Sequence, residues 1–286
     1  MLHQQELDQL IQEIKKKKEL QSIDDHFVEE QLRQYLQQEP RLLKSLQENF
    51  NPKSKAYTAV IKHLRSQLRR VYGLFRDDAK ERKALVQKLL VTPKMRRDTL
   101  LWQILSTHSS TQERLPFYQK IYAAIFSITG RPKSILDLGS GINPFSFSYM
   151  NLPACAYYAY DINKEEINFL NQYFQLLHRE NPSFTGKAVV ADIMKVSLSQ
   201  ADLCLLFKMT DVLDKGKGHK KTEELLIKIP AKYVVISFAT KTMSGKVMTA
   251  PRRSWVEWLC KRFGYEYKVV EFPNEIMYVI KKNSKK

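Results

Sequence analysis

The stretch ILDLGSGINPF, residues Ile135 to Phe145, places Gly139 and Gly141 directly after a short apolar run. Glycine permits a tight turn and lets a ligand approach the backbone closely. Asn143 can cap a helix that follows, and Pro144 suits the first turn of such a helix. The stretch therefore predicts a strand, a glycine turn and a helix, although glycines in such a turn often serve geometry alone.

The alternation of strands and helices continues through the rest of the sequence. β-rich runs recur as SILDLG, YYAYDI, KAVVADI, DLCLLFKM and KYVVISF, with helical segments such as KEEINFLNQYFQLLHRE between them. Short strands that alternate with helices predict a mostly parallel sheet covered on both faces. The last two runs, YEYKVVEF and EIMYVIKK, are separated only by Pro273 and Asn274, so they must pair antiparallel. We expect an α/β, Rossmann-like domain over residues 107–286.

The first 106 residues follow a different pattern. They contain no strand-like run, and their apolar residues recur at helical spacing, as in Leu7, Leu10 and Ile11. Ser54 can cap a long helix with an apolar face. We therefore expect an all-helical domain over residues 1–106.

The net charge of +17 predicts a polyanionic partner. Residues 1–50 carry 7 basic and 10 acidic residues, a balance of −3, whereas residues 51–106 carry 14 basic and 4 acidic residues, a balance of +10. A solvated helical surface explains scattered lysines, but this one-sided excess favours a face that binds RNA phosphates. The RNA-binding residues that we predict in this segment are Arg65, Arg69, Arg70, Arg96 and Arg97.

A second basic segment follows the fifth predicted strand, in the loop TKTMSGKVMTAPRRS. We expect this loop to be mobile alone and to become ordered on RNA, with a charged, solvated loop as the competing interpretation. The phosphate-binding residues that we predict there are Lys241, Lys246, Arg252 and Arg253.

Other features of the sequence limit its class and location. No apolar run approaches the roughly 18 residues of a membrane span. The first residues, MLHQQELDQL, lack the basic-then-apolar order of a secretory signal, so a cytoplasmic location is expected. Cys155, Cys204 and Cys260 lie far apart in apolar segments without metal-ligand spacing. They predict buried free thiols and no metal site.

Acidic residues end the second and third predicted strands. Asp161 follows Gly141 by 161 − 141 = 20 residues, the offset at which an acid accepts hydrogen bonds from ribose hydroxyls. Asp192 is placed where a carboxylate can accept a hydrogen bond from the amine of adenine. Each acid alone could be a helix N-cap, but together with the glycine turn they favour an adenosine-containing ligand. Because Pro144 replaces the third glycine of a dinucleotide fingerprint, S-adenosylmethionine fits better than NAD.

The stretch HSSTQERLPFY, residues 108–118, comes immediately before the predicted sheet. Together with LDLGSGINP, YDIN, LLFK and FPNE, it resembles the aminoglycoside-resistance methyltransferases that modify a decoding-centre guanine of 16S ribosomal RNA at N7. The resemblance covers roughly residues 105–286, and the final antiparallel pair looks like the seventh-strand insertion of class I methyltransferases. It implies S-adenosylmethionine as cofactor and 16S rRNA within the 30S subunit as partner. We expect the protein to act as a monomer.

The resemblance also implies roles for single residues. Arg114 would pair with the methionine carboxylate of the cofactor, which its planar guanidinium can bind at both oxygens. Without the resemblance, an ion pair with Glu113 or a helix acid would be preferred for it. Phe207 would pack near the adenine, and Lys208 would position the target base or a neighbouring phosphate. The expected cofactor-binding residues are His108, Ser109, Ser110, Arg114, Gly139, Gly141, Asp161, Asp192, Ile193 and Phe207.

The reaction that the resemblance implies needs little acid–base chemistry. Guanine N7 carries a lone pair and no proton, so it can attack the sulfonium methyl directly, and catalysis rests on positioning. Lys208 is therefore not expected to accept a proton. Two alternatives remain: a methyltransferase for another rRNA or tRNA site, and a catalytically inactive RNA-binding or ribosome-assembly protein with the same fold.

Overall fold

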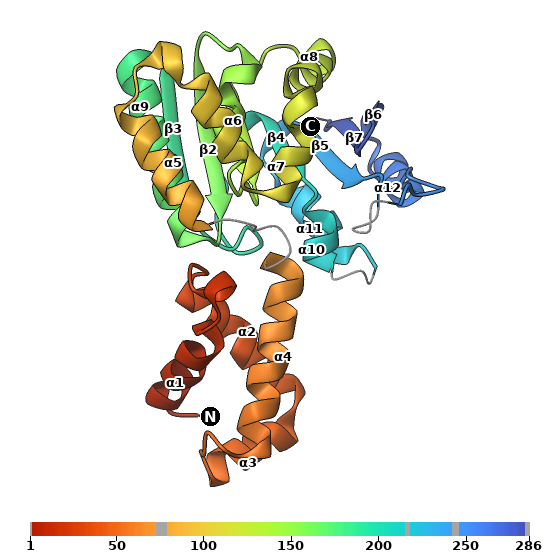
Figure 1. Cartoon of the computed structure of the whole chain (residues 1–286). Helices are drawn as coiled ribbons and strands as arrows, with labels where there is room; N and C mark the ends of the chain where they lie inside the picture. Colours follow the sequence, from red (N-terminus) through yellow and green to blue (C-terminus); the bar gives the residue numbers. More distant parts are fainter. Residues whose placement is uncertain (1, 73–78, 215–217, 242–245, 284–286) are drawn as a thin grey trace. The chain divides into compact units, whose positions relative to one another are not determined.

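The structure is a computed structural model that describes residues 2–72, 79–214, 218–241 and 246–283 (Figure 1). The chain divides into two compact units. The first comprises residues 1–76 and 162–164, and the second comprises residues 77–161 and 165–286. Among the described helices, none combines the length and the apolar character that a membrane crossing requires.

The first unit is helical, as the sequence predicts. Its elements are α1 (Gln4–Lys15), η1 (Lys18–Leu20), α2 (Asp25–Gln38), α3 (Pro40–Glu48) and α4 (Lys55–Tyr72). The apolar residues of their amphipathic faces form one core, in which Leu10, Leu32 and Leu64 are fully buried. The predicted cap of the long helix is confirmed, because the Tyr57 backbone N–H donates to Ser54 Oγ at 3.1 Å.

The second unit begins with further helices before its sheet. They are α5 (Ala79–Val91), η3 (Lys94–Arg96), α6 (Asp98–Ser106), α7 (Ser109–Arg114), η4 (Leu115–Phe117) and α8 (Tyr118–Thr129). The helical region was predicted to end as a domain at residue 106, whereas the division falls after Arg76. The reason is packing: Val86 and Leu89 of α5 and Ile104 of α6 are buried in the same core cluster as strand residues of the sheet.

The sheet of the second unit has seven strands. They are β1 (Ser134–Leu138), β2 (Cys155–Asp161), β3 (Phe184–Val190), β4 (Ala201–Phe207), β5 (Ala231–Ala239), β6 (Glu266–Phe272) and β7 (Glu275–Lys281). Their spatial order is β3-β2-β1-β4-β5-β7-β6. The first five strands pair in parallel, and β7 pairs antiparallel with both β5 and β6. The predicted fold, a mostly parallel sheet with an antiparallel final pair, is confirmed.

Helices cover both faces of this sheet (Figure 1). Alternate strand residues point to opposite faces, so Leu203 and Leu205 of β4 join one core while Cys204 and Leu206 join the other. The first core packs against α5, α6, α8, η5 (Asn143–Met150) and α9 (Lys164–Glu180). The second packs against α11 (Lys220–Lys228) and α12 (Ser254–Phe263), with α10 (Thr210–Asp214) following β4.

Local details differ from the sequence-based prediction in two places. Asn143 is the first residue of a 3-10 helix rather than its cap, because its side chain is drawn inward, donating to Asp137 Oδ2 at 2.9 Å. Strand β3 ends at Val190, so Asp192 lies two residues beyond the strand instead of ending it. The prediction of buried free thiols is confirmed for all three cysteines.

Candidate cofactor site

The glycine turn lies at the carboxyl end of β1, which is the edge where open parallel sheets bind ligands. Gly139 and Gly141 both have left-handed backbones, with φ of 66° and 48°. The backbone N–H groups of Gly139 and Ser140 donate to the Tyr160 carbonyl of β2 at 2.8 and 3.1 Å. The turn is therefore fastened to the end of the neighbouring strand.

The two glycines have different surroundings. A Cβ atom at Gly139 would lie 2.2 Å from Met209 Sδ, so the side chain of Met209 packs directly on this backbone. A Cβ atom at Gly141 would meet nothing closer than 3.8 Å. Gly139 is therefore required for both its conformation and its packing, whereas Gly141 is required for conformation alone.

Asp161 lies at the carboxyl end of β2 and contacts the turn. Its Oδ2 accepts a hydrogen bond from the Gly141 backbone N–H at 2.9 Å. A carboxylate offers about four lone-pair sites, so this bond does not exclude the predicted contact with ribose hydroxyls. The structure thus brings Gly141 and Asp161 together, and their contact with a ribose stays a prediction.

Asp192 and Ile193 lie in the loop after β3. Asp192 Oδ1 accepts from the Met194 backbone N–H at 2.9 Å, a local turn contact, and no helix follows that this acid could cap. Ile193 is buried in the core cluster that β1 and β4 share. The contact of these two residues with an adenine stays a prediction.

The segment before the sheet forms a short helix that begins after His108. His108 is the N-terminal flanking residue of α7, and its Nδ1 lies 3.0 Å from Ser110 Oγ. The side chains of His108, Ser109 and Ser110 are half-buried. His108 Nε2 lies 3.8 Å from the position of a Cβ atom on Gly141, so this segment reaches the glycine turn.

Arg114, the last residue of α7, is buried and already has a carboxylate partner. Its Nε and Nη2 donate to Glu275 Oε2 and Oε1 at 2.7 and 2.8 Å. Burial opposes the charged form of Arg114, but the carboxylate of Glu275 outweighs this effect and raises the pKa. Arg114 was predicted to bind a cofactor carboxylate with its fork, and in this structure the fork is engaged by Glu275 instead.

Phe207 and Lys208, at the end of β4, lie beside the pair of Arg114 and Glu275. The guanidinium of Arg114 lies over the Phe207 ring, 4.6 Å from its centroid. Lys208 forms an ion pair with Glu113, and its Nζ lies 4.0 Å from Glu275 Oε2. Lys208 also has a left-handed backbone, with φ of 55°, which is unusual for a residue with a side chain. The two cations are thus balanced by two carboxylates.

Glu275 is the site residue that the sequence analysis did not assign. It begins β7, and the short connection from β6 to β7 places it beside β5, where it is 2% exposed. The signal was present, because Glu275 is the last residue of the quoted FPNE stretch. The pattern alone does not show that this acid meets a residue 161 positions earlier in the chain.

A second buried carboxylate, Asp137, lies under the glycine turn. Its Oδ2 accepts hydrogen bonds from Asn143 Nδ2 at 2.9 Å and from the Tyr157 hydroxyl at 2.8 Å. The Tyr118 hydroxyl donates in turn to Asn143 Oδ1 at 3.0 Å. Burial raises the pKa of Asp137 to about 6, although both hydrogen bonds oppose the shift.

The basic residues of the first unit that were predicted to bind RNA differ in their exposure to solvent. Arg65 turns inward, donating to the Ile14 carbonyl at 3.3 Å and pairing with Glu13 at 3.2 Å. Arg69 is about half exposed and pairs with Glu19 at 2.6 Å. The side chain of Arg70 lies outside the described residues.

Arg96 and Arg97 are neighbours with opposite surroundings. Arg96 is exposed, whereas Arg97 is mostly buried, donates to the Thr92 carbonyl at 2.6 Å and forms an ion pair with Glu180. The prediction treated both as phosphate ligands. Arg97 instead holds α9 against the turn between α5 and α6.

The loop after β5 is described at its two ends. Lys241 and Lys246 are exposed, and the residues between them lie outside the described part of the chain. Arg252 pairs with Glu257 at 2.8 Å. Arg253 turns inward, where its guanidinium donates to backbone carbonyls of this loop and of β5. Arg253 therefore anchors the loop, whereas the two lysines and Arg252 are exposed to solvent.

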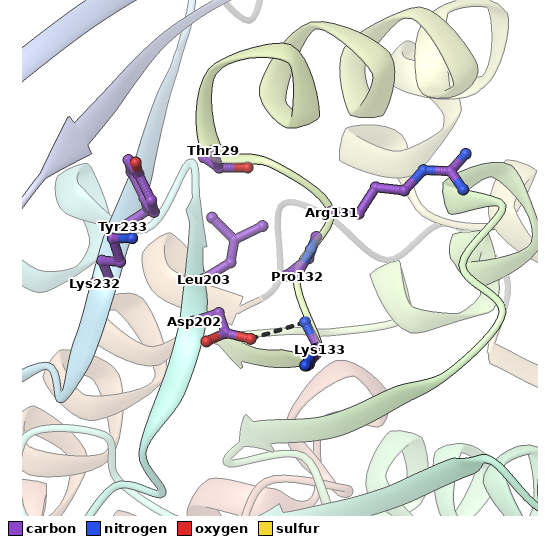
Figure 2. Close-up of a pocket in the computed structure, with 8 residues that line it drawn as sticks. All are labelled: Thr129, Arg131, Pro132, Lys133, Asp202, Leu203, Lys232 and Tyr233. Atoms are coloured by element: carbon purple, nitrogen blue, oxygen red, sulfur yellow. Dashed lines mark hydrogen bonds between the residues drawn. The ribbon is translucent and has the colours of Figure 1, made fainter.

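A pocket lies at the opposite edge of the sheet from the glycine turn and the Arg114–Glu275 pair (Figure 2). It has a volume of about 320 Å³ and lies at the amino ends of β1, β4 and β5, where Asp202 accepts hydrogen bonds from the backbone N–H groups of Lys133 and Ser134. Parallel sheets bind ligands at the other edge. Among the described residues, no group of three or more His, Cys, Asp or Glu side chains gathers as a metal site would require.

The sheet order, the antiparallel β7, the glycine turn and the acid at the end of β2 define a class I methyltransferase fold. The structure of the 16S rRNA methyltransferase RmtF in complex with S-adenosyl-L-homocysteine matches with a TM-score of 0.72 and 20% identity, over 99% of this chain and 100% of that chain, which shows the shared fold. The ribosomal RNA methyltransferase (FmrO) family matches residues 32–279, and the chain belongs to this family. The family predicted from the sequence stretches is confirmed.

Two curated relatives show how far the similarity extends. A 16S rRNA (guanine(1405)-N(7))-methyltransferase of Frankia casuarinae is 30% identical over 180 residues, which are 61% of this chain and 61% of the relative. An enzyme of the same name from Proteus mirabilis is 32% identical over 146 residues, or 50% of each chain. The chain thus matches between half and two thirds of the length of these relatives.

Proposed function

We propose that the protein is an S-adenosylmethionine-dependent methyltransferase that transfers a methyl group to guanine N7 of 16S rRNA. The observation that carries this proposal is that the glycine turn with Asp161, and the buried Arg114–Glu275 pair, lie at the carboxyl ends of the parallel strands in a member of an rRNA methyltransferase family. The substrate and the atom modified are those in the names of its curated relatives.

The residues present fit such a cofactor at its ribose end. Asp161 supplies a side-chain acceptor, and the left-handed glycine turn exposes backbone at the same place. The fit at the methionine end differs from the predicted two-point contact, because Glu275 engages both Nε and Nη2 of Arg114. Within this proposal the ion pair fixes the guanidinium, and the half-buried His108 segment contributes polar groups beside it.

The chemistry asks these residues to bind, align and exclude water. The cofactor, when bound, supplies the methyl group on a positively charged sulfur, and guanine N7 attacks without losing a proton. No side chain needs to act as a general base, so the barrier is lowered by the alignment of nucleophile, methyl and leaving sulfur. Lys208, held by Glu113 beside Glu275, is suited to orient an anionic substrate group and is proposed as a positioning residue.

The RNA partner is proposed from charge and exposure together. Arg96, Lys241, Lys246 and Arg252 are exposed cations and keep their predicted role as phosphate contacts, within a chain of net charge +17. Each phosphate contact that is lost should lower the salt slope of binding by about one unit or less. Arg96→Ala is expected to lower this salt slope without lowering the stability of the protein.

One experiment tests the function as a whole. Purified 30S subunits are incubated with the protein and S-adenosylmethionine labelled in its methyl group, and the label is located by mass spectrometry of RNA fragments. A 7-methylguanine in the decoding centre is expected. A methyl group elsewhere in rRNA would favour a different target, and cofactor binding without transfer to any subunit or tRNA would favour an inactive RNA-binding protein.

We propose that the protein acts as a monomer in the cytoplasm, where its subunit substrate is found.

A further inference from the structure

Arg82 lies in the first turn of α5, within the strongly basic segment, yet its side chain is 2% exposed. Its guanidinium makes three hydrogen bonds of 2.7 Å inside the second unit. Nε donates to Thr107 Oγ1, Nη2 donates to the Thr107 carbonyl, and Nη1 donates to Glu166 Oε1. A cation in this position cannot contact an RNA phosphate.

The first partner of Arg82 fixes the beginning of α7. Thr107 comes directly before His108 and is itself buried, with its hydroxyl also donating to the Ile104 carbonyl at 2.7 Å. Because Arg82 binds both the hydroxyl and the carbonyl of Thr107, the backbone at the junction of α6 and α7 is held in one orientation. The direction in which α7 leaves this junction depends on that orientation.

The second partner of Arg82 reaches the glycine turn. Glu166 lies in the first turn of α9 and is 3% exposed. A Cβ atom on Gly141 would lie 3.8 Å from Glu166 Oε2 and 3.8 Å from His108 Nε2. One carboxylate therefore contacts Arg82 through one oxygen and approaches the glycine turn with the other.

We infer that Arg82 is a positioning residue of the cofactor site, a role that rests on the proposed function. Its guanidinium fixes, relative to one another, the junction before α7, the first turn of α9 and the glycine turn between them. Arginine suits this task because its donors form a rigid planar fork, whereas a lysine ammonium is a single point charge on a flexible chain. Removing either charge would cost the other this buried ion-pair contact.

The test compares Arg82→Lys and Arg82→Met with two matched controls. Arg97→Met removes another largely buried arginine that pairs with α9, at the far end of the helix, through Glu180. Lys83→Met removes an exposed charge from the same turn of α5. For each folded variant we would measure the affinity for S-adenosyl-L-homocysteine by calorimetry, binding to 30S subunits over a range of salt, and amide hydrogen exchange without any ligand.

We expect Arg82→Met to weaken S-adenosyl-L-homocysteine binding at least tenfold and Arg82→Lys to recover part of this loss. Amide exchange should become faster at residues 107–110 and 139–143, while the salt slope of subunit binding stays unchanged. Both controls should bind S-adenosyl-L-homocysteine like the unaltered protein. If Arg82→Met does not fold, Arg82→Lys carries the same comparison.

Specific results would overturn the inference. Affinity within twofold of the unaltered protein in both Arg82 variants, or an equal loss in Arg97→Met, would show that Arg82 does not position this site. A lowered salt slope would return Arg82 to the RNA-binding set. If the unaltered protein does not bind S-adenosyl-L-homocysteine, the proposed function fails. The exchange rates then still decide whether Arg82 holds the two segments.

Discussion

The pair of Arg114 and Glu275 allows a prediction whose size follows from the structure. The side chains are 3% and 2% exposed and share two hydrogen bonds of 2.7 and 2.8 Å. Removing one partner of such a buried pair costs about 3–5 kcal/mol, because the remaining charge stays buried. In Glu275→Gln the amide oxygen can still accept one bond, so we expect a loss of about 3–4 kcal/mol.

The reverse change should cost less. In Arg114→Met the carboxylate of Glu275 keeps a cation nearby, since Lys208 Nζ lies 4.0 Å away. We expect a loss of about 2–3 kcal/mol. The double variant Arg114→Met/Glu275→Leu replaces the pair with apolar side chains and should recover most of the stability, because such replacements are often neutral.

Urea unfolding followed by tryptophan fluorescence measures these differences for the second unit alone. This probe is selective because all the tryptophans of the chain belong to that unit: Trp102, Trp255 and Trp258. Single variants that each lose under about 1 kcal/mol would show that the pair is not desolvated as described. A double variant as unstable as the sum of the single variants would show that the two side chains do not interact.

Further predictions concern the glycine turn and the two acids beside it. Asp161→Ala should weaken S-adenosylmethionine binding by about 1.5–3 kcal/mol, measured by calorimetry, and an unchanged affinity in the folded variant would remove Asp161 from the site. Gly139→Ala should destabilise the second unit by more than the 1–2 kcal/mol that a left-handed backbone costs, because its Cβ meets Met209, whereas Gly141→Ala should cost about that amount. Adding Met209→Ala to Gly139→Ala should remove the part of the destabilisation that comes from the clash with Met209. If urea unfolding shows no such recovery of stability, the packing argument is contradicted. The pKa of Asp137 is about 6 in the folded state and about 3.9 in the unfolded state, so between these pH values the folded state holds a proton that the unfolded state has released. The free energy of unfolding is therefore highest at low pH and falls as the pH rises from about 4 to 6. The stability of Asp137→Asn relative to the unaltered protein should therefore rise by about 2 kcal/mol between pH 4 and pH 6.5, and a flat difference would refute the raised pKa.

The sequence predicted those features that depend on neighbouring residues. The strand, turn and helix around Gly139 follow from apolar runs and glycine, and the contact between Gly141 and Asp161 follows from parallel pairing of successive strands. The contact of Arg114 with Glu275 could not be predicted, because it joins residues 161 positions apart and depends on where β7 inserts.

Burial was the other property that local patterns did not reveal. Arg97 occurs in a basic run and looks like a surface cation, yet it is mostly buried against α9. The boundary at Arg76 was missed for a similar reason. The apolar faces of α5 and α6 predict helices that pack on something, and the pattern does not say whether that is another helix or the sheet.

The position of β7 has a consequence for the order in which parts of the protein can fold during synthesis. Of the strands described, β7 is synthesised last, but it lies between β5 and β6 in the sheet. Arg114 therefore leaves the ribosome well before the carboxylate that neutralises it, because synthesis runs from the amino terminus. A guanidinium without that partner is costly to bury. The end of α7 can reach its final packing only once β7 has inserted, so a nascent chain that has not yet produced this strand cannot form the complete site.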